Sequence, residues 1–112
     1  AGRAADYPPV YGKIDEICMK MQEDYNKSLT VSHYADLCNL SESRFAHLFK
    51  EKCGISPKKY ITKIKISTAL NLLTDSDLPL AEISSIVGFE DYNYFCRIIK
   101  KETGLSPSCF RK

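Results

Sequence analysis

The sequence predicts an all-α fold of about seven helices, arranged as two similar subdomains that are joined by one long central helix. Three observations support this prediction. Apolar residues recur at helical spacing over most of the 112 residues, cap and stop residues bound each such stretch, and the second half of the chain repeats the pattern of the first half. The length allows one compact domain or two very small subdomains, and a hydrophobic share of 44% is ordinary for a globular protein.

Residues 1–12 are expected to be a linker or a cloning remnant, because they contain Pro8–Pro9 and two glycines and show no periodicity. A helix is predicted from Lys13 onward. Its apolar residues fall on one face, at i, i+3, i+4, i+7 and i+11: Ile14, Ile17, Cys18, Met21 and Tyr25.

Two further helices complete a first subdomain, which is predicted to span residues 13–56. Thr30 can cap a short helix, whose apolar stripe consists of Val31, Tyr34, Ala35 and Cys38. Ser41 can cap the next helix, over residues 42–53, and Gly54 is a natural left-handed residue to end it. The buried side of this helix is formed by Phe45, Leu48 and Phe49.

The long central helix is predicted over residues 57–74. It starts at Ser56-Pro57, which combines a cap with a proline at the first helical position. It carries two apolar stripes, formed by Tyr60 and Ile64 and by Ile66, Ala69, Leu70 and Leu73. A helix that is apolar toward two sides has to pack against two partners, so we expect it to connect the two subdomains.

The second subdomain is predicted over residues 75–112. Asp75-Ser76-Asp77 interrupts the long helix, and the apolar pattern then begins again with Leu80, Ile83, Ser84 and Val87. Asp91 can cap a helix over residues 92–103, and Gly104 can end it. A last turn is expected after Ser106-Pro107.

The two subdomains form an internal repeat with an offset of 50 residues. Placing Phe45 on Phe95 also aligns Lys50 with Lys100, Gly54 with Gly104, and Ser56-Pro57 with Ser106-Pro107. The preceding short helices align as well, with one residue inserted in the second turn. A short helix packed across a capped second helix is the helix-turn-helix arrangement, in which the second helix enters the major groove of DNA.

The charges are arranged in blocks. Residues 41–65 carry seven basic and two acidic side chains, and residues 91–112 carry five basic and two acidic ones. The block between them, residues 66–90, has four acidic side chains and no basic one. Two basic blocks on the repeated helices favour contact with a polyanion, although charge alone would also fit an ordinary solvated surface.

The outward faces of the two repeated helices have side chains that suit base edges. Arg97 can bond guanine in bidentate fashion, Asn93 can pair with adenine, and Ala46 can contact a thymine methyl group. The predicted base-reading residues are Ser43, Arg44, Ala46 and His47 on the first helix and Tyr92, Asn93, Cys96 and Arg97 on the second. The predicted phosphate contacts are Lys50, Lys58, Lys59, Lys100, Lys101 and Arg111.

Several of these residues have simpler interpretations that stay open at this point. The lysine pairs would also serve as solvated charges, and His47 would also serve as an ordinary surface histidine. Cys96 is either a redox-sensitive thiol on the reading face or a passive small residue.

Over residues 13–112, the sequence resembles the C-terminal DNA-binding domain of the AraC/XylS family of bacterial transcription regulators. The second half carries the more specific match, namely Leu80-Ala81-Glu82-Ile83, Val87-Gly88-Phe89-Glu90-Asp91, Tyr94-Phe95-Cys96-Arg97 and Lys100-Lys101-Glu102-Thr103-Gly104-Leu105-Ser106-Pro107. The first half matches at Leu37, Leu40-Ser41, Arg44-Phe45, Leu48-Phe49-Lys50 and Gly54-Ile55-Ser56-Pro57. Ile99 stands where an aromatic residue is usual in the family.

This resemblance implies sequence-specific binding of double-stranded DNA, with the two units reading successive major-groove segments. It also implies a separate sensing or dimerisation domain N-terminal to this one, and contact with RNA polymerase in some members. No cofactor is expected.

Other classes of function have less support. The five cysteines form no C-x-x-C pair, which suits neither a zinc site nor a disulfide framework, so we expect no metal and reduced thiols in a cytoplasmic protein. No nucleophile–base pattern, phosphate loop or carboxylate pair indicates an enzyme. The alternative that stays open is a protein-interaction module that contacts RNA polymerase or another partner and binds DNA only non-specifically.

Overall fold

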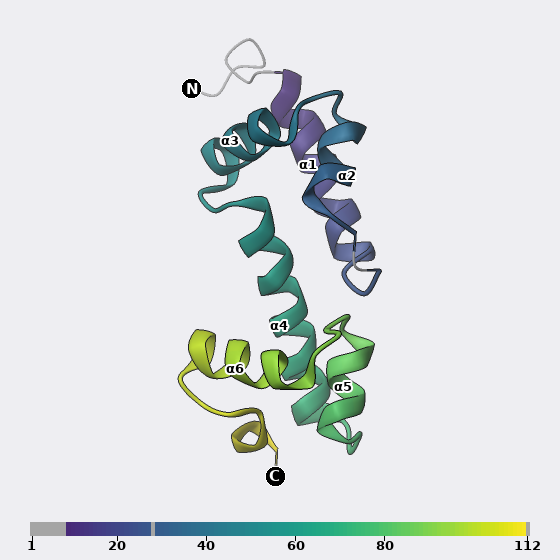
Figure 1. Ribbon diagram of the computed structural model, residues 1–112, viewed down its shortest axis with the longest axis vertical. Coiled ribbons are helices and arrows are strands. Elements are labelled where there is room, and N and C mark those ends of the chain that lie inside the picture. Colours follow the sequence, from purple (N-terminus) through teal and green to yellow (C-terminus); the bar gives the residue numbers. More distant parts are fainter. Residues whose placement is uncertain (1–8, 28, 112) are drawn as a thin grey trace. The chain divides into compact units, whose positions relative to one another are not determined.

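Figure 1 shows a chain built from helices alone over the residues that the structure describes, 9–27 and 29–111. In this range, the computed structural model contains six α-helices and one short 3-10 helix, which confirms the all-α prediction. Their bounds are α1 Pro9–Glu23, α2 Val31–Leu37, α3 Glu42–Cys53, α4 Pro57–Asp75, α5 Leu80–Ile86, α6 Tyr92–Thr103 and η2 Pro107–Phe110. None of these helices is long and apolar enough to cross a membrane.

The chain forms two compact units. Unit 1 contains α1, α2, α3 and the start of α4 up to Ile61. Unit 2 contains α4 from Thr62 onward, α5, α6, η2 and a short segment after α1 that begins at Tyr25. The division therefore falls inside α4, whereas the predicted boundaries lie at its two ends, after residues 56 and 74.

In unit 1, α1 begins four residues earlier than predicted. Pro9 starts the helix, so residues 9–12 are helical and not part of a linker. Proline is tolerated in a first helical turn because the N–H that it lacks would have no partner there. The remaining residues of the predicted linker, 1–8, lie outside the described residues. Ile14, Ile17 and Met21 are buried as predicted.

The sequence predicted that Tyr25 belongs to the apolar face of α1, and this prediction was wrong. The helix ends at Glu23, and the Tyr25 side chain packs against the core of unit 2. Its spacing of i+11 from Ile14 continued the pattern, but periodicity alone cannot show where a helix stops.

The caps predicted for unit 1 are present. The Thr30 hydroxyl accepts a hydrogen bond from the His33 N–H, and the Ser41 hydroxyl accepts one from the Arg44 N–H, both at 3.1 Å. α3 ends at Gly54, which adopts the left-handed conformation with φ 85°. These contacts satisfy backbone groups that helix ends leave without partners.

Unit 2 is built around one apolar cluster. The face of α4 toward α5 and α6 supplies three of its members, and Phe95 and Ile99 of α6 are completely buried. Ile99 therefore fills the core without the aromatic ring that is usual at its place. The full cluster is Ile66, Ala69, Leu73, Ile83, Val87, Phe89, Phe95 and Ile99.

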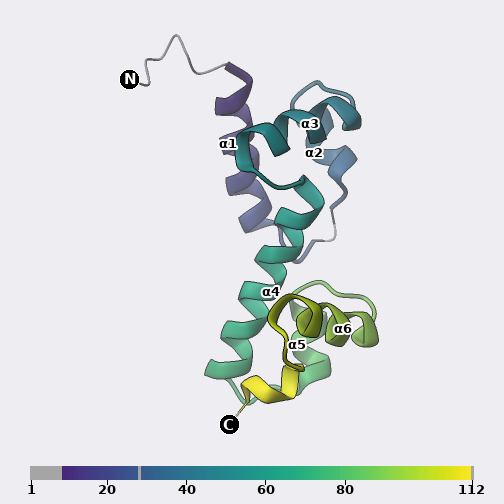
Figure 2. The same ribbon diagram turned by 90° about the vertical axis from the view of Figure 1, so that its left-hand side faces the viewer.

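The internal repeat is confirmed element by element. α2 and α5 each have seven residues, and α3 and α6 each have twelve, at offsets of 49 and 50. The offsets differ because the second turn is one residue longer, as predicted. In each pair the short helix packs against the longer one (Figure 1 and Figure 2).

The repeat also extends to the helix that precedes each pair, which the sequence comparison did not include. Buried Ile14, Ile17 and Met21 of α1 correspond to buried Ile66, Ala69 and Leu73 of α4 at a constant offset of 52. Each unit is therefore a three-helix unit, and the C-terminal part of α4 takes in unit 2 the place that α1 takes in unit 1.

Candidate nucleic-acid interface

The two longer helices of the repeat, α3 and α6, expose equivalent faces. Phe45 and Phe49 are completely buried on α3, as are Phe95 and Ile99 on α6. Residues 41–50 and residues 91–100 show the same sequence of exposed, half-buried and buried states. Because each helix is fixed by one buried face, its opposite face is held outward. We call α3 and α6 the reading helices.

On α3, the predicted base-reading residues lie on the outward face. Ser43, Arg44 and His47 are exposed, and Ala46 is half-buried between them and the core side. Lys50 is exposed in the last turn of the helix. This face therefore offers hydroxyl, guanidinium, methyl and imidazole groups, a set that can bond base edges and contact a thymine methyl group.

His47 lies beside an acidic residue that the sequence analysis did not single out. Its Nε2 lies 3.5 Å from Oε2 of Glu51, one helical turn further on. The hydroxyl of Tyr11 on α1 donates to Oε1 of the same carboxylate at 2.6 Å. The i, i+4 spacing of His47 and Glu51 was visible in the sequence, whereas the contact with Tyr11 depends on how α1 packs.

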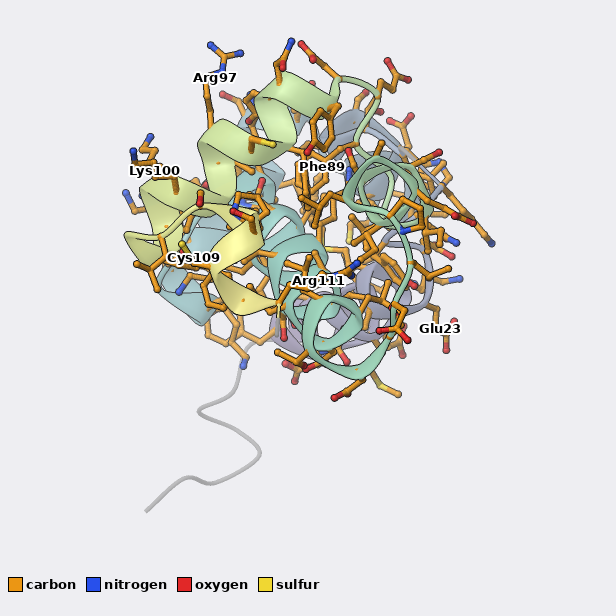
Figure 3. The ribbon with its side chains drawn as sticks, turned by 90° about the horizontal axis from the view of Figure 1, so that it is seen from below. Glu23, Phe89, Arg97, Lys100, Cys109 and Arg111 are labelled. Atoms are coloured by element: carbon orange, nitrogen blue, oxygen red, sulfur yellow. The ribbon has the colours of Figure 1, made fainter. Side chains whose placement is uncertain are left out.

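On α6, Asp91 starts the helix and directs its first turn. Its carboxylate accepts a hydrogen bond from the Asn93 N–H at 2.9 Å, as the predicted cap requires. Asn93 and Arg97 are exposed. The Arg97 guanidinium lies 5.9 Å from the centre of the Tyr94 ring, in a cation–π arrangement. Figure 3 shows Arg97 and Lys100 extending outward from α6.

Tyr92 and Cys96 form a contact of their own on α6. A hydrogen bond with the Cys96 thiol raises the pKa of Tyr92. The Tyr92 ring also stacks on Phe95, with centroids 6.2 Å apart. Cys96 is half-buried and packs against the core of unit 2. Cys96 therefore lies between the outward face and the core, and Tyr92 lies at the edge of the outward face.

The predicted phosphate contacts divide into two groups. Lys50, Lys58, Lys59, Lys100 and Lys101 are all exposed. Lys58 and Lys59 lie in the first turn of α4, where the Ser56 hydroxyl accepts a hydrogen bond from the Lys59 N–H at 3.2 Å. Helix N-termini and exposed amino groups are both suited to anions.

Arg111 differs from these lysines, and its geometry does not support the predicted phosphate contact. Its Nη1 donates to the backbone carbonyl of Leu78, in the segment between α4 and α5. Nε and Nη2 are buried and have no partner among the described residues. The side chain is therefore directed into unit 2, because the end of the chain folds back over that segment.

Lys65 is a functional candidate that sequence reasoning missed. Its Nζ donates to the carbonyl of Gly88, in the turn between α5 and α6, at 3.2 Å and lies 5.3 Å from the centre of the Phe89 ring. Burial lowers the pKa of Lys65, and the nearby charge of Glu90 opposes this effect. Lys65 thus fixes the turn from which reading helix α6 starts. Only the tertiary structure brings Lys65 and Gly88 together.

Comparisons with known proteins agree with this geometry. A family described as "Helix-turn-helix domain" matches residues 34–112. The chain is 36% identical over 106 residues to the arabinose operon regulatory protein of Escherichia coli K12, which covers 94% of this chain and 36% of that protein. The chain thus spans about a third of the length of the curated relatives that it matches.

Two solved structures have the same fold. The C-terminal domain of AraT, a response regulator from Geobacillus stearothermophilus, superposes with a TM-score of 0.84 at 29% identity, over 94% of this chain and 85% of that one. The DNA-binding domain of AdpA in complex with a target DNA superposes with a TM-score of 0.84 over 88% of this chain and 89% of that one. At 21% identity, this second likeness concerns the fold alone.

Proposed function

Because this chain belongs to the AraC-type helix-turn-helix family and is a sequence-specific DNA-binding domain of that family, we propose that α3 and α6 read two successive major-groove segments of one site. The observation that carries this proposal is the equivalence of the two outward faces, since both helices have the same length, the same left-handed glycine after the last residue and the same pattern of burial. A second helix held in this way across a short one enters the major groove.

The base-reading residues that we propose are the ones on these faces. Arg97 bonds guanine O6 and N7, Asn93 bonds adenine, and His47 donates to guanine or to a phosphate. Each good base contact contributes about 1–3 kcal/mol of discrimination against the wrong base. The proposed set is Ser43, Arg44, Ala46, His47, Tyr92, Asn93, Cys96 and Arg97.

The exposed lysines supply the contacts that position the domain without reading sequence. Lys50 and Lys100 occupy equivalent places in the last turns of α3 and α6, and Lys58 and Lys59 follow at the start of α4. We assign phosphate contacts to these four residues and to Lys101. Arg111 is left out because its guanidinium is engaged within unit 2.

In the whole protein, this domain would act in transcription regulation together with a further domain. The arabinose operon regulatory protein that it matches is about three times as long as the matched region. We propose a sensing or dimerisation domain N-terminal to this one, and contact with RNA polymerase at the regulated promoter. A gel-mobility assay with this chain, its DNA site and RNA polymerase tests the proposed polymerase contact. If no ternary complex forms, the chain does not contact the polymerase.

A protein-interaction function is the second candidate, and one observation favours it. Leu37 and Ile86 are the last residues of α2 and α5, occupy equivalent places in the repeat, and are 39% and 37% exposed. The same apolar exposure in both units is the feature that a partner protein could contact.

In-vitro selection of duplex DNA by the unmodified chain tests the main proposal. We expect an enriched motif with two segments about one helical turn, or 10 base pairs, apart. Binding to the selected site should weaken with salt, with a log–log slope of about −0.9 per neutralised phosphate. If selection enriches no motif, the protein-interaction function is the better description.

A further inference from the structure

Two cysteine thiols face each other inside unit 1. Cys18 lies on α1 and Cys53 is the last residue of α3, and their sulfur atoms are 3.8 Å apart. Both side chains are half-buried, and both thiols are free. A disulfide bond has an S–S length of about 2.05 Å, so the two sulfurs need to approach by less than 2 Å to form one.

The surroundings hold the two thiols in this arrangement. Lys52, next to Cys53, forms an ion pair with Asp15 of α1 at 3.1 Å. The Tyr60 hydroxyl hydrogen-bonds the Cys18 thiol and accepts a hydrogen bond from Gln22 at 3.1 Å. The approach of α1 to the end of α3 is therefore fixed by contacts other than the thiols themselves.

The repeat supplies an internal comparison. Cys18 corresponds to Leu70 at the offset of 52, and Cys53 corresponds to Thr103 at the offset of 50. Leu70 packs against the core of unit 2, and the Thr103 hydroxyl donates to the carbonyl of Ile99 at 2.7 Å. The fold therefore does not need thiols at these two places.

We propose that Cys18 and Cys53 form a thiol–disulfide site that exchanges with small-molecule disulfides such as oxidised glutathione, and whose oxidised form ties α1 to the C-terminal end of reading helix α3. The inference concerns thiol chemistry alone and does not depend on which bases α3 reads. It modifies the sequence-based expectation that all five cysteines stay reduced.

The exchange proceeds in two balanced steps. The Cys53 thiolate attacks one sulfur of oxidised glutathione, which forms a mixed disulfide and releases one glutathione thiolate. Cys18 then loses its proton and attacks the Cys53 sulfur, which forms the protein disulfide and releases the second glutathione thiolate. The two protein protons end on the two glutathione molecules. Burial, together with the neighbouring Cys53, raises the pKa of Cys18 to about 11, which makes Cys18 a poor attacking group in the first step.

The bridge would join two helices of unit 1. It closes a loop from residue 18 to residue 53 that contains all of α2 and almost all of α3, and so restricts the unfolded chain. Unit 2 has no counterpart, since Leu70 and Thr103 cannot form it. Oxidation is therefore expected to raise the unfolding midpoint of unit 1.

To test the proposal, the unmodified chain is equilibrated in glutathione redox buffers and its free thiols are then trapped. The chain is cleaved after Lys and Arg, and linked peptides are identified by mass spectrometry. The five cysteines fall into five different peptides, and the expected link joins residues 14–20 to residues 53–58. In the native chain this link should form with an equilibrium constant at least about tenfold higher than in the same chain unfolded in urea.

Equal constants in the native and the unfolded chain, or a different pair as the main link, would overturn the proposal. The Cys18→Ser variant should stop at a mixed disulfide of Cys53 with glutathione, whereas Cys109→Ser should form the bridge normally. If Cys18→Ser does not fold, the comparison of native and unfolded unmodified chain still decides the question.

Discussion

Gly54 and Gly104 end the two reading helices with the same backbone conformation, at φ 85° and φ 84°. In each case the glycine N–H donates to the carbonyl of a lysine four residues earlier, Lys50 or Lys100, at 2.8 Å. No atom lies near the place of an added Cβ at either glycine. Both positions therefore require glycine for its backbone freedom alone.

Gly88 imposes a second requirement, which leads to a first prediction. Its φ is 90°, and an added Cβ would lie 3.2 Å from the Cα of Asn26 and the carbonyl oxygen of Tyr25. Gly104→Ala should cost about 1–2 kcal/mol of unfolding free energy from backbone strain, and Gly88→Ala should cost about 1–3 kcal/mol more. Urea denaturation of the two variants measures both. Equal losses would show that the segment at Tyr25 and Asn26 moves aside freely.

Ser84 offers a way to stabilise the chain. Its side chain is 2% exposed, and its hydroxyl has no hydrogen-bond partner among the described residues. Its counterpart in unit 1, at the offset of 49, is the buried Ala35. An unsatisfied buried hydroxyl costs about 1–3 kcal/mol, so Ser84→Ala should raise the unfolding free energy by about 1 kcal/mol. Ala35→Ser is the matched control and should lower it. A Ser84→Ala variant that is less stable would indicate an unseen partner for the hydroxyl.

Lys65 and Lys100 should have separable roles. Lys100 is exposed on α6 and is proposed to contact a phosphate, so Lys100→Met should reduce the salt-dependence slope of DNA binding by about 0.9. Lys65 bonds the Gly88 carbonyl within unit 2, so Lys65→Met should leave the slope unchanged and lower stability by about 1 kcal/mol. Binding isotherms at several salt concentrations distinguish the two. A reduced slope for Lys65→Met would mean that Lys65 turns toward DNA.

Much of the fold followed from local signals. Asp91 and Gly104 bound α6 because a carboxylate can cap the first turn and because glycine tolerates a positive φ, and both properties are visible in the residue itself. The repeat then related one unit to the other. Helical periodicity is also a local signal, so the exposed positions of Asn93 and Arg97 on α6 could be predicted from the spacing of Phe95 and Ile99.

The rest depended on contacts between segments far apart in the sequence. Lys65 and Gly88 are 23 residues apart, and no pattern around either residue indicates that they meet. Arg111 reads as a surface cation until its contact with Leu78 is seen. Tyr25 continues the period of α1 and yet packs in unit 2. In each case the deciding energy comes from tertiary packing, which a local pattern does not contain.

Tyr34 should make the stability of unit 1 sensitive to high pH. Its hydroxyl lies 3.4 Å from Oδ2 of Asp24, and burial, together with that carboxylate, raises the pKa of Tyr34 to about 12 from an ordinary value of 10. A raised folded-state pKa stabilises the fold below the unfolded pKa, and this contribution is lost as pH rises from about 10 to about 12. Tyr34→Phe should remove that part of the pH dependence.

Urea unfolding of the two proteins between pH 9 and pH 12 measures the difference. Solvent partly screens the contribution of Tyr34 to the unfolding free energy. Its loss should nevertheless make stability fall more steeply with pH in the unmodified chain than in the variant. Parallel curves would show that Tyr34 ionises as freely in the folded chain as in the unfolded one.

The most direct test of two-segment reading is in-vitro selection repeated with the Arg97→Ala variant, with Lys20→Ala on the exposed side of α1 as the control. Arg97 is an exposed residue of α6, and α3 is a separate helix with its own buried face and caps. We predict that Arg97→Ala relaxes the preference in one segment of the selected motif, at a cost of about 1–3 kcal/mol for that base pair, and leaves the other segment unchanged. Loss of preference in both segments, or in neither, would contradict the assignment of one groove segment to each reading helix.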